Sequence, residues 1–377
     1  ITRRGGSGEV IVEFDNFMPS NVDPPDEELI HSTPTALSVA RCDFAGASVG
    51  DYALFAGGYS NSFFNPVDTV DAYNASLIRS TPTPLSVARS ALAWASVGDY
   101  ALFAGGYIGS SGQSDTVDAY DVSLVRSTPA TLSVTRAYFA GASVGDYALF
   151  AGGHDDNYNP MDTIDVYNAS LVRSTPATLS VAKSGFAGAS VGNYALFAGG
   201  YSGGRTYRDT VDAYNASLVR STPTALSVAR CDFAWASVGD YALFAGGWDG
   251  SYWDTVDAYN ASLIRSTPVT LSVVRGYLAG ASVGDYALFA GGEDYDSHWD
   301  TVDAYDAFLV RSTPTALSVA RWYLAGASVG NYALFAGGQD VDYDYRDTVD
   351  AYGPPLPMAR LYMPIGTKYK FGESEET

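Results

Sequence analysis

Seven near-identical copies of one unit fill most of this 377-residue chain, and this repetition constrains the fold more than any other feature. Each unit of 45–48 residues runs, with few changes, from Ser-Val-Ala-Arg through Ser-Val-Gly and Tyr-Ala-Leu-Phe-Ala-Gly-Gly to Asp-Thr-Val-Asp-Ala-Tyr. The glycine pairs of the seven copies are Gly57-Gly58, Gly105-Gly106, Gly152-Gly153, Gly199-Gly200, Gly246-Gly247, Gly291-Gly292 and Gly337-Gly338. A period of this length predicts an array of supersecondary units that bury their apolar faces against one another.

One copy reads as four strands that run from the inside of such an array to its outside. Residues 42–48 are small and apolar, and Tyr52–Ala56 is a short apolar strand that ends at the paired glycines. Residues 68–73 alternate polar and apolar side chains, as a half-exposed strand does. The last segment contains Pro82 and Pro84, which a strand tolerates only at a sheet edge. This order predicts one propeller blade for each unit.

The spacing within the unit resembles that of kelch repeats. A tyrosine follows the second glycine by fifteen residues (Gly58 to Tyr73), and an arginine precedes the first by sixteen (Arg41 to Gly57). The resemblance covers roughly residues 26–352, although the tryptophan that follows the tyrosine in that family is absent. It implies an all-β fold, namely a seven-bladed β-propeller of kelch-type four-stranded blades.

The two ends of the array predict how the ring closes. The seventh unit stops at Tyr352 without an outer strand, while Glu28–Leu37 matches the outer strand at Ser76–Leu85. An N-terminal outer strand is therefore expected to complete the last blade and remove the open sheet edge. Residues 1–25 are then an N-terminal extension, and 353–377 are a C-terminal extension or the start of a further domain. The chain begins at Ile1, so we expect a processed form or a piece of a longer protein.

Composition narrows the partner classes. A net charge of −21 repels phosphate backbones, so nucleic acid is not an expected partner. No apolar run is long enough to cross a membrane, so membrane insertion is not expected. Cys42 and Cys231 stand four units apart, too far for a disulfide in a seven-bladed ring, and we expect two free thiols. The compartment is open, with an extracellular or surface-associated location favoured.

Differences among the copies gather in two places. One is the insert after the paired glycines, which has six to nine residues, and the other is the pair of positions after the repeat arginine. The turn between the first and second strands is Ser-Val-Gly in every copy. In an up-and-down blade, the connection between strands 2 and 3 and the one between blades emerge on the same face. One variable face and one constant face are therefore predicted.

Aromatic and small polar residues dominate the variable positions, and such residues favour recognition surfaces. Trp94 and Trp235 replace a glycine of the innermost strand and are expected to reshape the channel wall. The candidate ligand-binding residues are Tyr59, Phe63, Trp94, Tyr107, Tyr138, His154, Tyr158, Tyr201, Trp235, Trp248, Tyr252, Tyr277, Tyr295, Trp322, Tyr323 and Tyr343. The alternative is that these loops are polar and variable only because loops generally are.

The first motif of every unit, Ser-Val-Ala-Arg or a close variant, ends in a basic residue. These residues are Arg41, Arg89, Arg136, Lys183, Arg230, Arg275 and Arg321, and they are expected to ring the channel mouth. Such a ring could hold a carboxylate, a sulfate or an acidic sugar. The second interpretation, which we favour because all seven copies retain the residue, is that each pairs with a nearby aspartate as part of the repeat.

Catalytic and metal motifs are scarce. The run Asp340, Asp342 and Asp344 lacks the glycine that a calcium loop usually needs, so no metal is expected. Some kelch-like propellers are enzymes, including copper-radical galactose oxidases and sialic-acid epimerases. The few histidines here stand in different contexts, and no nucleophile triad or phosphate loop is present. No cofactor is expected, and Glu293 with His298 is the place where a catalytic group would be sought.

These observations predict a non-catalytic recognition module that binds a protein or glycan ligand through one variable, aromatic-rich face. Alanine in place of Tyr59, Trp248 or Trp322 is expected to weaken binding without unfolding the propeller. A kelch-type enzyme acting on a sugar at the channel mouth is the main alternative. A passive scaffold with function in neighbouring domains is the third.

Overall fold

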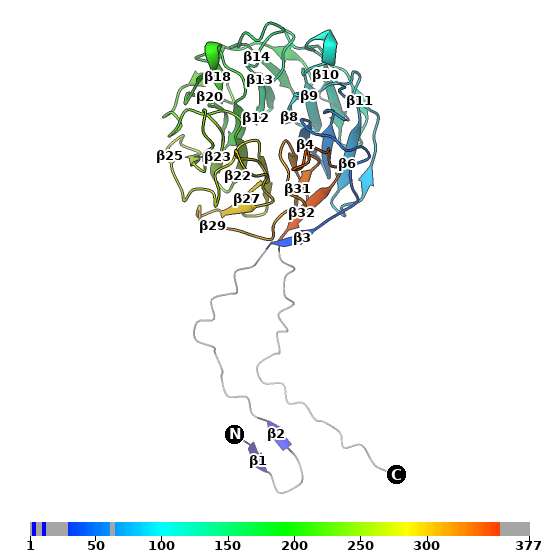
Figure 1. Ribbon diagram of the computed structural model, residues 1–377, viewed down its shortest axis with the longest axis vertical. Helices are drawn as coiled ribbons and strands as arrows, with labels where there is room; N and C mark the ends of the chain where they lie inside the picture. The colour runs from blue at the N-terminus through cyan, green and yellow to red at the C-terminus, as the bar shows by residue number, and fades with distance from the viewer. Residues whose placement is uncertain (1, 5–9, 13–28, 61–64, 355–377) are drawn as a thin grey trace. The chain divides into compact units, whose positions relative to one another are not determined.

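The computed structural model describes residues 2–4, 10–12, 29–60 and 65–354, and Leu29–Pro354 form one compact unit. Seven antiparallel sheets of four strands each are arranged in a ring about a central axis in this unit (Figure 1). The described residues contain no α-helix, only the short 3₁₀ turns η1 (Gly109–Ser111) and η2 (Gly203–Arg205). The predicted all-β, seven-bladed propeller is therefore confirmed.

Every blade is built from equivalent strands. The innermost strands are β4 (Ala45–Val49), β8 (Ala93–Val97), β12 (Ala140–Val144), β16 (Ala187–Val191), β22 (Ala234–Val238), β26 (Ala279–Val283) and β30 (Ala325–Val329). The second strands are β5 (Tyr52–Ala56), β9 (Tyr100–Ala104), β13 (Tyr147–Ala151), β17 (Tyr194–Ala198), β23 (Tyr241–Ala245), β27 (Tyr286–Ala290) and β31 (Tyr332–Ala336). We number the blades 1 to 7 in this order.

The third strands are β6 (Val70–Asn74), β10 (Val117–Asp121), β14 (Ile164–Asn168), β20 (Val211–Asn215), β24 (Val256–Asn260), β28 (Val302–Asp306) and β32 (Val349–Gly353). The outer strands are only two or three residues long. They are β7 (Arg79–Ser80), β11 (Arg126–Ser127), β15 (Arg173–Ser174), β21 (Arg220–Ser221), β25 (Arg265–Ser266), β29 (Arg311–Ser312) and β3 (Ile30–Ser32). Such short outer strands leave little exposed edge for pairing with another chain.

The core lies between neighbouring blades. Along β5, Leu54 and its alternate neighbours pack toward blade 2, where they meet Phe103 and Tyr120. Phe55 points the other way, into the cluster that blade 1 shares with blade 7. The period-two alternation of a strand thus gives each blade two apolar faces. Seven such clusters, one at each junction, hold the ring together.

The seven basic repeat residues lie inside the blades, each fully buried beside an aspartate of the third strand. The pairs, with nitrogen–oxygen distances, are Arg41–Asp71 (2.8 Å), Arg89–Asp118 (2.5 Å), Arg136–Asp165 (2.7 Å), Lys183–Asp212 (3.5 Å), Arg230–Asp257 (2.9 Å), Arg275–Asp303 (2.7 Å) and Arg321–Asp350 (2.6 Å). The expectation of a basic ring at the channel mouth is therefore wrong. Pairing with an aspartate, the alternative drawn from the sequence, describes the geometry.

Ring closure follows the sequence prediction. Strand β3 pairs with β32, with Ile30 opposite Gly353 and His31 opposite Tyr352, so the N-terminal strand completes blade 7. In the other six blades an outer-strand arginine lies near the buried aspartate, for example Arg79 at 3.5 Å from Asp71. His31 takes this place in blade 7, where its Nε2 lies 2.7 Å from Asp350 Oδ1.

A ring of serine hydroxyls links the innermost strands around the channel. The Ser96 hydroxyl donates to the Ser48 carbonyl at 2.7 Å, and Ser48 in turn donates to Ser328 at 2.6 Å. The remaining donors, each bonded to the preceding blade, are Ser143, Ser190, Ser237, Ser282 and Ser328. Because the last hydroxyl donates toward the blade before it and the first donates to the last, the ring is closed.

The remaining described residues are two short strands, β1 (Thr2–Arg4) and β2 (Val10–Val12), which pair antiparallel and belong to the second compact unit. The rest of the predicted extensions at 1–25 and 353–377 falls almost wholly outside the described residues, as does the candidate residue Phe63. No helix among the described residues is long and apolar enough to span a membrane. Both cysteines are free and buried, as predicted.

Candidate functional site

The two variable positions of each repeat meet in the structure. The first residue after the arginine forms a β-bridge with the first residue of the insert in the same blade. The bridges are Cys42–Tyr59, Ser90–Tyr107, Ala137–His154, Ser184–Tyr201, Cys231–Trp248, Gly276–Glu293 and Trp322–Gln339. The inserts and the residues after the arginine therefore lie on one side of the ring, which we call the variable face.

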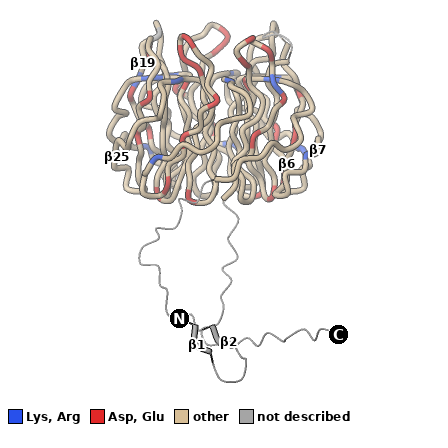
Figure 2. Tube along the Cα trace, turned by 60° about the horizontal axis from the view of Figure 1, so that its bottom comes forward, with Lys and Arg blue, Asp and Glu red and all other residues tan. Residues whose placement is uncertain are grey.

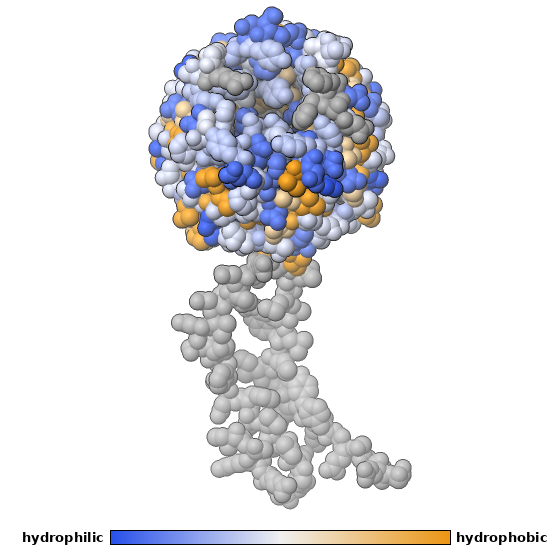
Figure 3. Space-filling model, viewed as in Figure 1, coloured by the Kyte–Doolittle hydropathy of each residue, from blue (hydrophilic) through white to orange (hydrophobic). Residues whose placement is uncertain are grey.

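The inserts of the variable face are acidic and polar. Their acidic residues are Asp155, Asp156, Asp249, Glu293, Asp294, Asp296, Asp340, Asp342 and Asp344. Their basic residues apart from histidine are Arg205, Arg208 and Arg346. Figure 2 shows red acidic segments in the loops along the upper edge of the propeller. In the view of Figure 3, pale and blue hydrophilic residues surround the centre, and apolar residues gather toward the rim.

A closed ring of backbone hydrogen bonds forms the channel mouth. The second residue after each arginine donates its N–H to the equivalent carbonyl of the preceding blade, at 2.9–3.3 Å. These seven residues are Asp43, Ala91, Tyr138, Gly185, Asp232, Tyr277 and Tyr323, and all have positive φ, between +48° and +63°. The backbone, rather than the side chain, thus makes this ring. The side chains at these positions are free to differ between blades.

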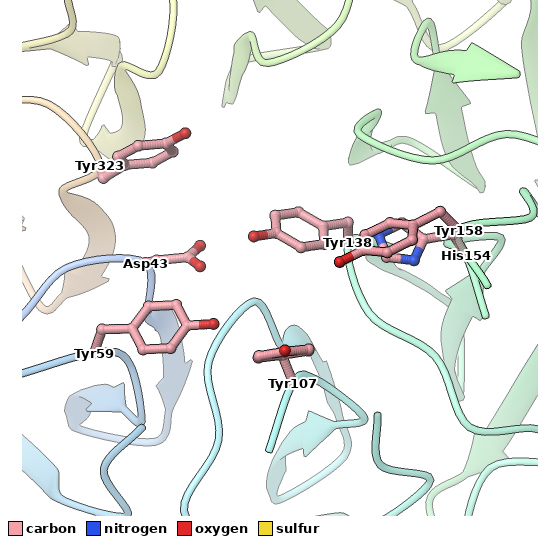
Figure 4. Close-up of a pocket in the computed structure, with 7 residues that line it drawn as sticks. All are labelled: Asp43, Tyr59, Tyr107, Tyr138, His154, Tyr158 and Tyr323. Carbon is pink, nitrogen blue, oxygen red and sulfur yellow. The ribbon is translucent and has the colours of Figure 1, made fainter. Parts of the chain in front are cut away.

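A cavity of about 230 Å³ opens at this mouth (Figure 4). Its described lining residues are Asp43, Tyr59, Tyr107, Tyr138, His154, Tyr158 and Tyr323. They come from blades 1, 2, 3 and 7, and all occupy variable positions of the repeat. In Figure 4 the Asp43 carboxylate and the Tyr138 hydroxyl point toward each other across the open space, with the Tyr59 and Tyr107 rings below them.

One wall of the cavity is a stack of three rings from blade 3. Tyr138 stacks on His154 with ring centroids 5.4 Å apart, and His154 contacts Tyr158 at 5.0 Å. Gln113 of blade 2 holds the imidazole, because its amide nitrogen lies 2.8 Å from His154 Nδ1 and donates to the Asp155 carbonyl. The orientation of Tyr138 is therefore fixed by its neighbours.

A second aromatic group lies on blades 6 and 7. Tyr277 contacts Tyr323 at 4.7 Å and Trp322 at 5.6 Å, and Trp322 lies 4.3 Å from Tyr323. His298 joins Trp322 to Tyr343, with centroid distances of 5.7 and 6.0 Å. Since Tyr323 also lines the cavity, this group continues the aromatic surface away from the mouth.

The other predicted aromatic residues of the inserts are not among the described lining residues of this cavity. Trp248 meets Tyr207 edge-on at 5.3 Å, and Tyr252 meets Tyr295 edge-on at 5.0 Å. Tyr201 heads the insert of blade 4 and bridges Ser184. These residues therefore lie on the predicted variable face without lining the cavity.

Glu293 and His298, the pair that the sequence indicates as the place for a catalytic group, lie close together in the structure. The Tyr252 hydroxyl donates to Glu293 Oε1 at 2.8 Å, and His298 Nε2 lies 3.5 Å from Oε2. Burial raises the pKa of Glu293, while the hydrogen bond from Tyr252 and the nearby His298 oppose that rise. A carboxyl group with a raised pKa can donate or accept a proton, which makes Glu293 a candidate catalytic group.

Trp94 and Trp235 meet inside the channel. They come from β8 and β22, which belong to blades 2 and 5, and their rings stack at 5.6 Å and 28°. Along the innermost strand, this position lies between the mouth residue and the serine of the hydroxyl ring. The two indoles therefore obstruct the channel below the mouth, so the site is a depression on one face.

Two aspartates at the mouth, Asp43 and Asp232, are further functional candidates that were not predicted from the sequence. Burial and the charge of Asp232 raise the pKa of Asp43 to about 7. Burial also raises the pKa of Asp232, against the hydrogen bonds from Cys231 and Tyr277. The charge of Asp43, followed by burial, raises the pKa of the Tyr138 phenol. In the sequence, these two aspartates stand out only because the second residue after the repeat arginine is an aspartate in two of the seven copies.

The raised pKa of Asp43 predicts a pH-dependent cost to folding. A carboxyl group whose pKa is about 7 when folded and near 3.8 when unfolded binds its proton more tightly in the folded state. Stability is therefore lost as pH rises from about 4 to about 7. We expect Asp43→Asn to gain about 1–2 kcal/mol relative to the wild type between pH 4 and pH 8, after allowance for solvent screening. Urea unfolding at both pH values measures this difference.

Asparagine suits the comparison because it tolerates the positive φ of this position. The exposed Asp51→Asn, in the turn of the opposite face, serves as the control for the loss of one carboxylate. A pH-independent difference between Asp43→Asn and the wild type would contradict the assigned titration.

Comparison with known proteins supports the fold. No family model matches the chain, and no curated protein matches it. Among solved structures, one titled "Structure of YjhT" is similar, with a TM-score of 0.57 and 13% sequence identity. The match covers 70% of this chain and 94% of that chain. At this identity the similarity concerns the fold alone.

Proposed function

We propose that this propeller is a non-catalytic recognition module that binds a protein or glycan ligand through the variable face. The observation that carries the proposal is the pairing of both variable positions in every blade on one side of the ring, where four of the blades also line a cavity. The turns of the opposite face repeat Ser-Val-Gly seven times. Divergence concentrated on one face is typical of a surface that contacts a changing partner, since solvent exposure alone would free both faces equally.

The residue types on the face support the same function. Tyrosine and tryptophan supply large contact area at low entropy cost, and they are enriched among residues that dominate binding energy. Here they form contiguous groups rather than isolated side chains, as with Tyr277, Trp322 and Tyr323. The kelch-type spacing of the repeats agrees with a role in interaction, and membership of that family is part of the proposal.

A binding screen tests the proposal directly. The propeller is applied to a glycan array and to a library of surface proteins, and the affinity of a hit is then measured for variants. Trp248→Ala and Trp322→Ala are each expected to weaken binding about tenfold or more, because truncation removes a large anchoring ring. Tyr59 is only 5% exposed, so Tyr59→Phe, which removes the hydroxyl alone, complements Tyr59→Ala.

Controls for this screen come from the opposite face. Asp51→Ala and Asp240→Ala lie in exposed turns of the constant face and should leave the affinity unchanged. Far-ultraviolet circular dichroism verifies that each variant is folded. Equal losses on the two faces would contradict the proposal.

An enzyme acting on a sugar is the second candidate, and one observation favours it. Glu293, Tyr252 and His298 form a hydrogen-bonded and charged group on the variable face. A sugar-oxidation assay together with metal analysis separates this function from recognition. Turnover that disappears in Glu293→Gln, while persisting in Asp51→Asn, would replace the first proposal with this one.

A further inference from the structure

The mouth cavity combines a carboxylate with aromatic walls. Asp43 is the one acidic side chain among its described lining residues, and five of the others are tyrosines. Figure 4 shows the carboxylate facing the cavity, with the rings of Tyr59, Tyr107 and Tyr138 around the same space. Tyrosine rings present a negative face that attracts cations. Carboxylate and rings together therefore favour a positively charged group.

No described side chain neutralises Asp43. The carboxylate has no hydrogen-bond or ion-pair partner among the described residues, whereas its counterpart Asp232 accepts a hydrogen bond from the Cys231 thiol at 3.0 Å. The repeat arginines beneath the mouth cannot serve, because Arg41 is already paired with Asp71 at 2.8 Å. Burial and the like charge of Asp232 raise the pKa of Asp43 to about 7. A bound cation would relieve both of these costs.

The surroundings of the cavity point to a macromolecular source for the cation. Acidic residues outnumber basic ones in the inserts around the mouth, and Arg346 is already paired with Asp340. A small free amine would contact only the cavity and not the acidic inserts around it. An acidic surface that extends over the inserts of several blades is complementary to a wider basic surface on a protein.

We propose that the mouth cavity binds the guanidinium or ammonium group of a basic side chain presented by a protein partner, between Asp43 and the tyrosine rings. This inference rests on the proposed recognition function and specifies its ligand chemistry. Arginine is the better fit of the two basic residues, since its planar group both stacks on aromatic rings and forms paired hydrogen bonds with a carboxylate.

Isothermal titration calorimetry with a defined probe tests the inference. The probe is an alternating glycine–arginine octapeptide, and its matched control replaces each arginine by citrulline, which has nearly the same shape without the charge. We expect the arginine peptide to bind at least about tenfold more tightly than the citrulline peptide. Asp43→Asn should weaken arginine-peptide binding by about the same factor.

The acidic chain attracts any basic peptide through its net charge, so the control variant must change that charge equally. Asp51→Asn on the opposite face removes one negative charge as Asp43→Asn does, and it should retain the full affinity. Equal affinities of the Asp43→Asn and Asp51→Asn variants would overturn the inference. Equal binding of the two peptides, or no binding of either, would do the same.

The proposed function and this inference fail in distinguishable ways. If a ligand from the binding screen loses affinity with Trp248→Ala but not with Asp43→Asn, the variable face is the binding surface and the cation is not its ligand. If neither variant changes the affinity for that ligand, recognition does not use this face.

Discussion

Asp165→Ala is expected to lower the free energy of unfolding by about 3–5 kcal/mol. The Asp165 carboxylate accepts hydrogen bonds from Arg136 at 2.7 Å and from Arg173 at 2.9 Å, and Ser133 donates to it through both its N–H and its hydroxyl. Alanine would leave the fully buried Arg136 without its counter-charge. An unpaired buried charge is strongly destabilising. Guanidinium unfolding monitored by tryptophan fluorescence measures the loss.

The chain supplies matched controls for this prediction. Blade 4 has a looser version of the same site, in which Lys183 lies 3.5 Å and Arg220 lies 3.7 Å from Asp212. Asp212→Ala should therefore cost less than Asp165→Ala. Asp146→Ala, in an exposed turn, should cost almost nothing. Equal losses at Asp165 and Asp146 would show that the buried pair does not stabilise the blade.

Gly141→Ala is expected to destabilise the ring by about 3 kcal/mol. A Cβ atom at Gly141 would lie 1.9 Å from the backbone carbonyl oxygen of Trp94 in the preceding blade. The obstacle is main chain on both sides, so no side-chain rotation can relieve it. The innermost strands β8 and β12 would have to separate, which also strains the serine hydroxyl ring. Thermal unfolding followed by circular dichroism measures the effect.

Gly203→Ala is the control for this change. An added Cβ at Gly203 meets nothing within 4 Å, so the variant should unfold at nearly the wild-type temperature. If Gly141→Ala proved as stable as Gly203→Ala, the close approach of blades 2 and 3 would not limit the side chain at this position.

Much of the architecture could be predicted from the repeat. Tyr52–Ala56 is continuously apolar, residues 68–73 alternate polar and apolar, and prolines follow at Pro82 and Pro84. The order of the strands within a blade could therefore be predicted from the sequence. The spare segment before the first unit predicted the pairing of β3 with β32. The single variable face followed from the up-and-down connections, which place two of the four loops together whatever the side chains are.

The features that escaped prediction depend on contacts between distant repeats. Trp94 and Trp235 stack because blades 2 and 5 face each other across the channel, and sequence spacing alone does not give the width of that channel. The burial of Arg136 depends on the depth of the blade, which places it beneath the mouth residue Tyr138. The raised pKa of Asp43 depends in part on the charge of Asp232, which belongs to a repeat four units further along the sequence.

The serine ring and the mouth ring use the same atoms at all seven junctions. Every unit therefore offers the same hydrogen-bond donors to the unit before it and the same carbonyl acceptors to the unit after it. Recombination between near-identical copies in the gene can replace one unit as a cassette, insert included, and leave both joints intact. New combinations of insert loops can thus arise in single genetic steps, with no compensating change in the hydrogen bonds between blades.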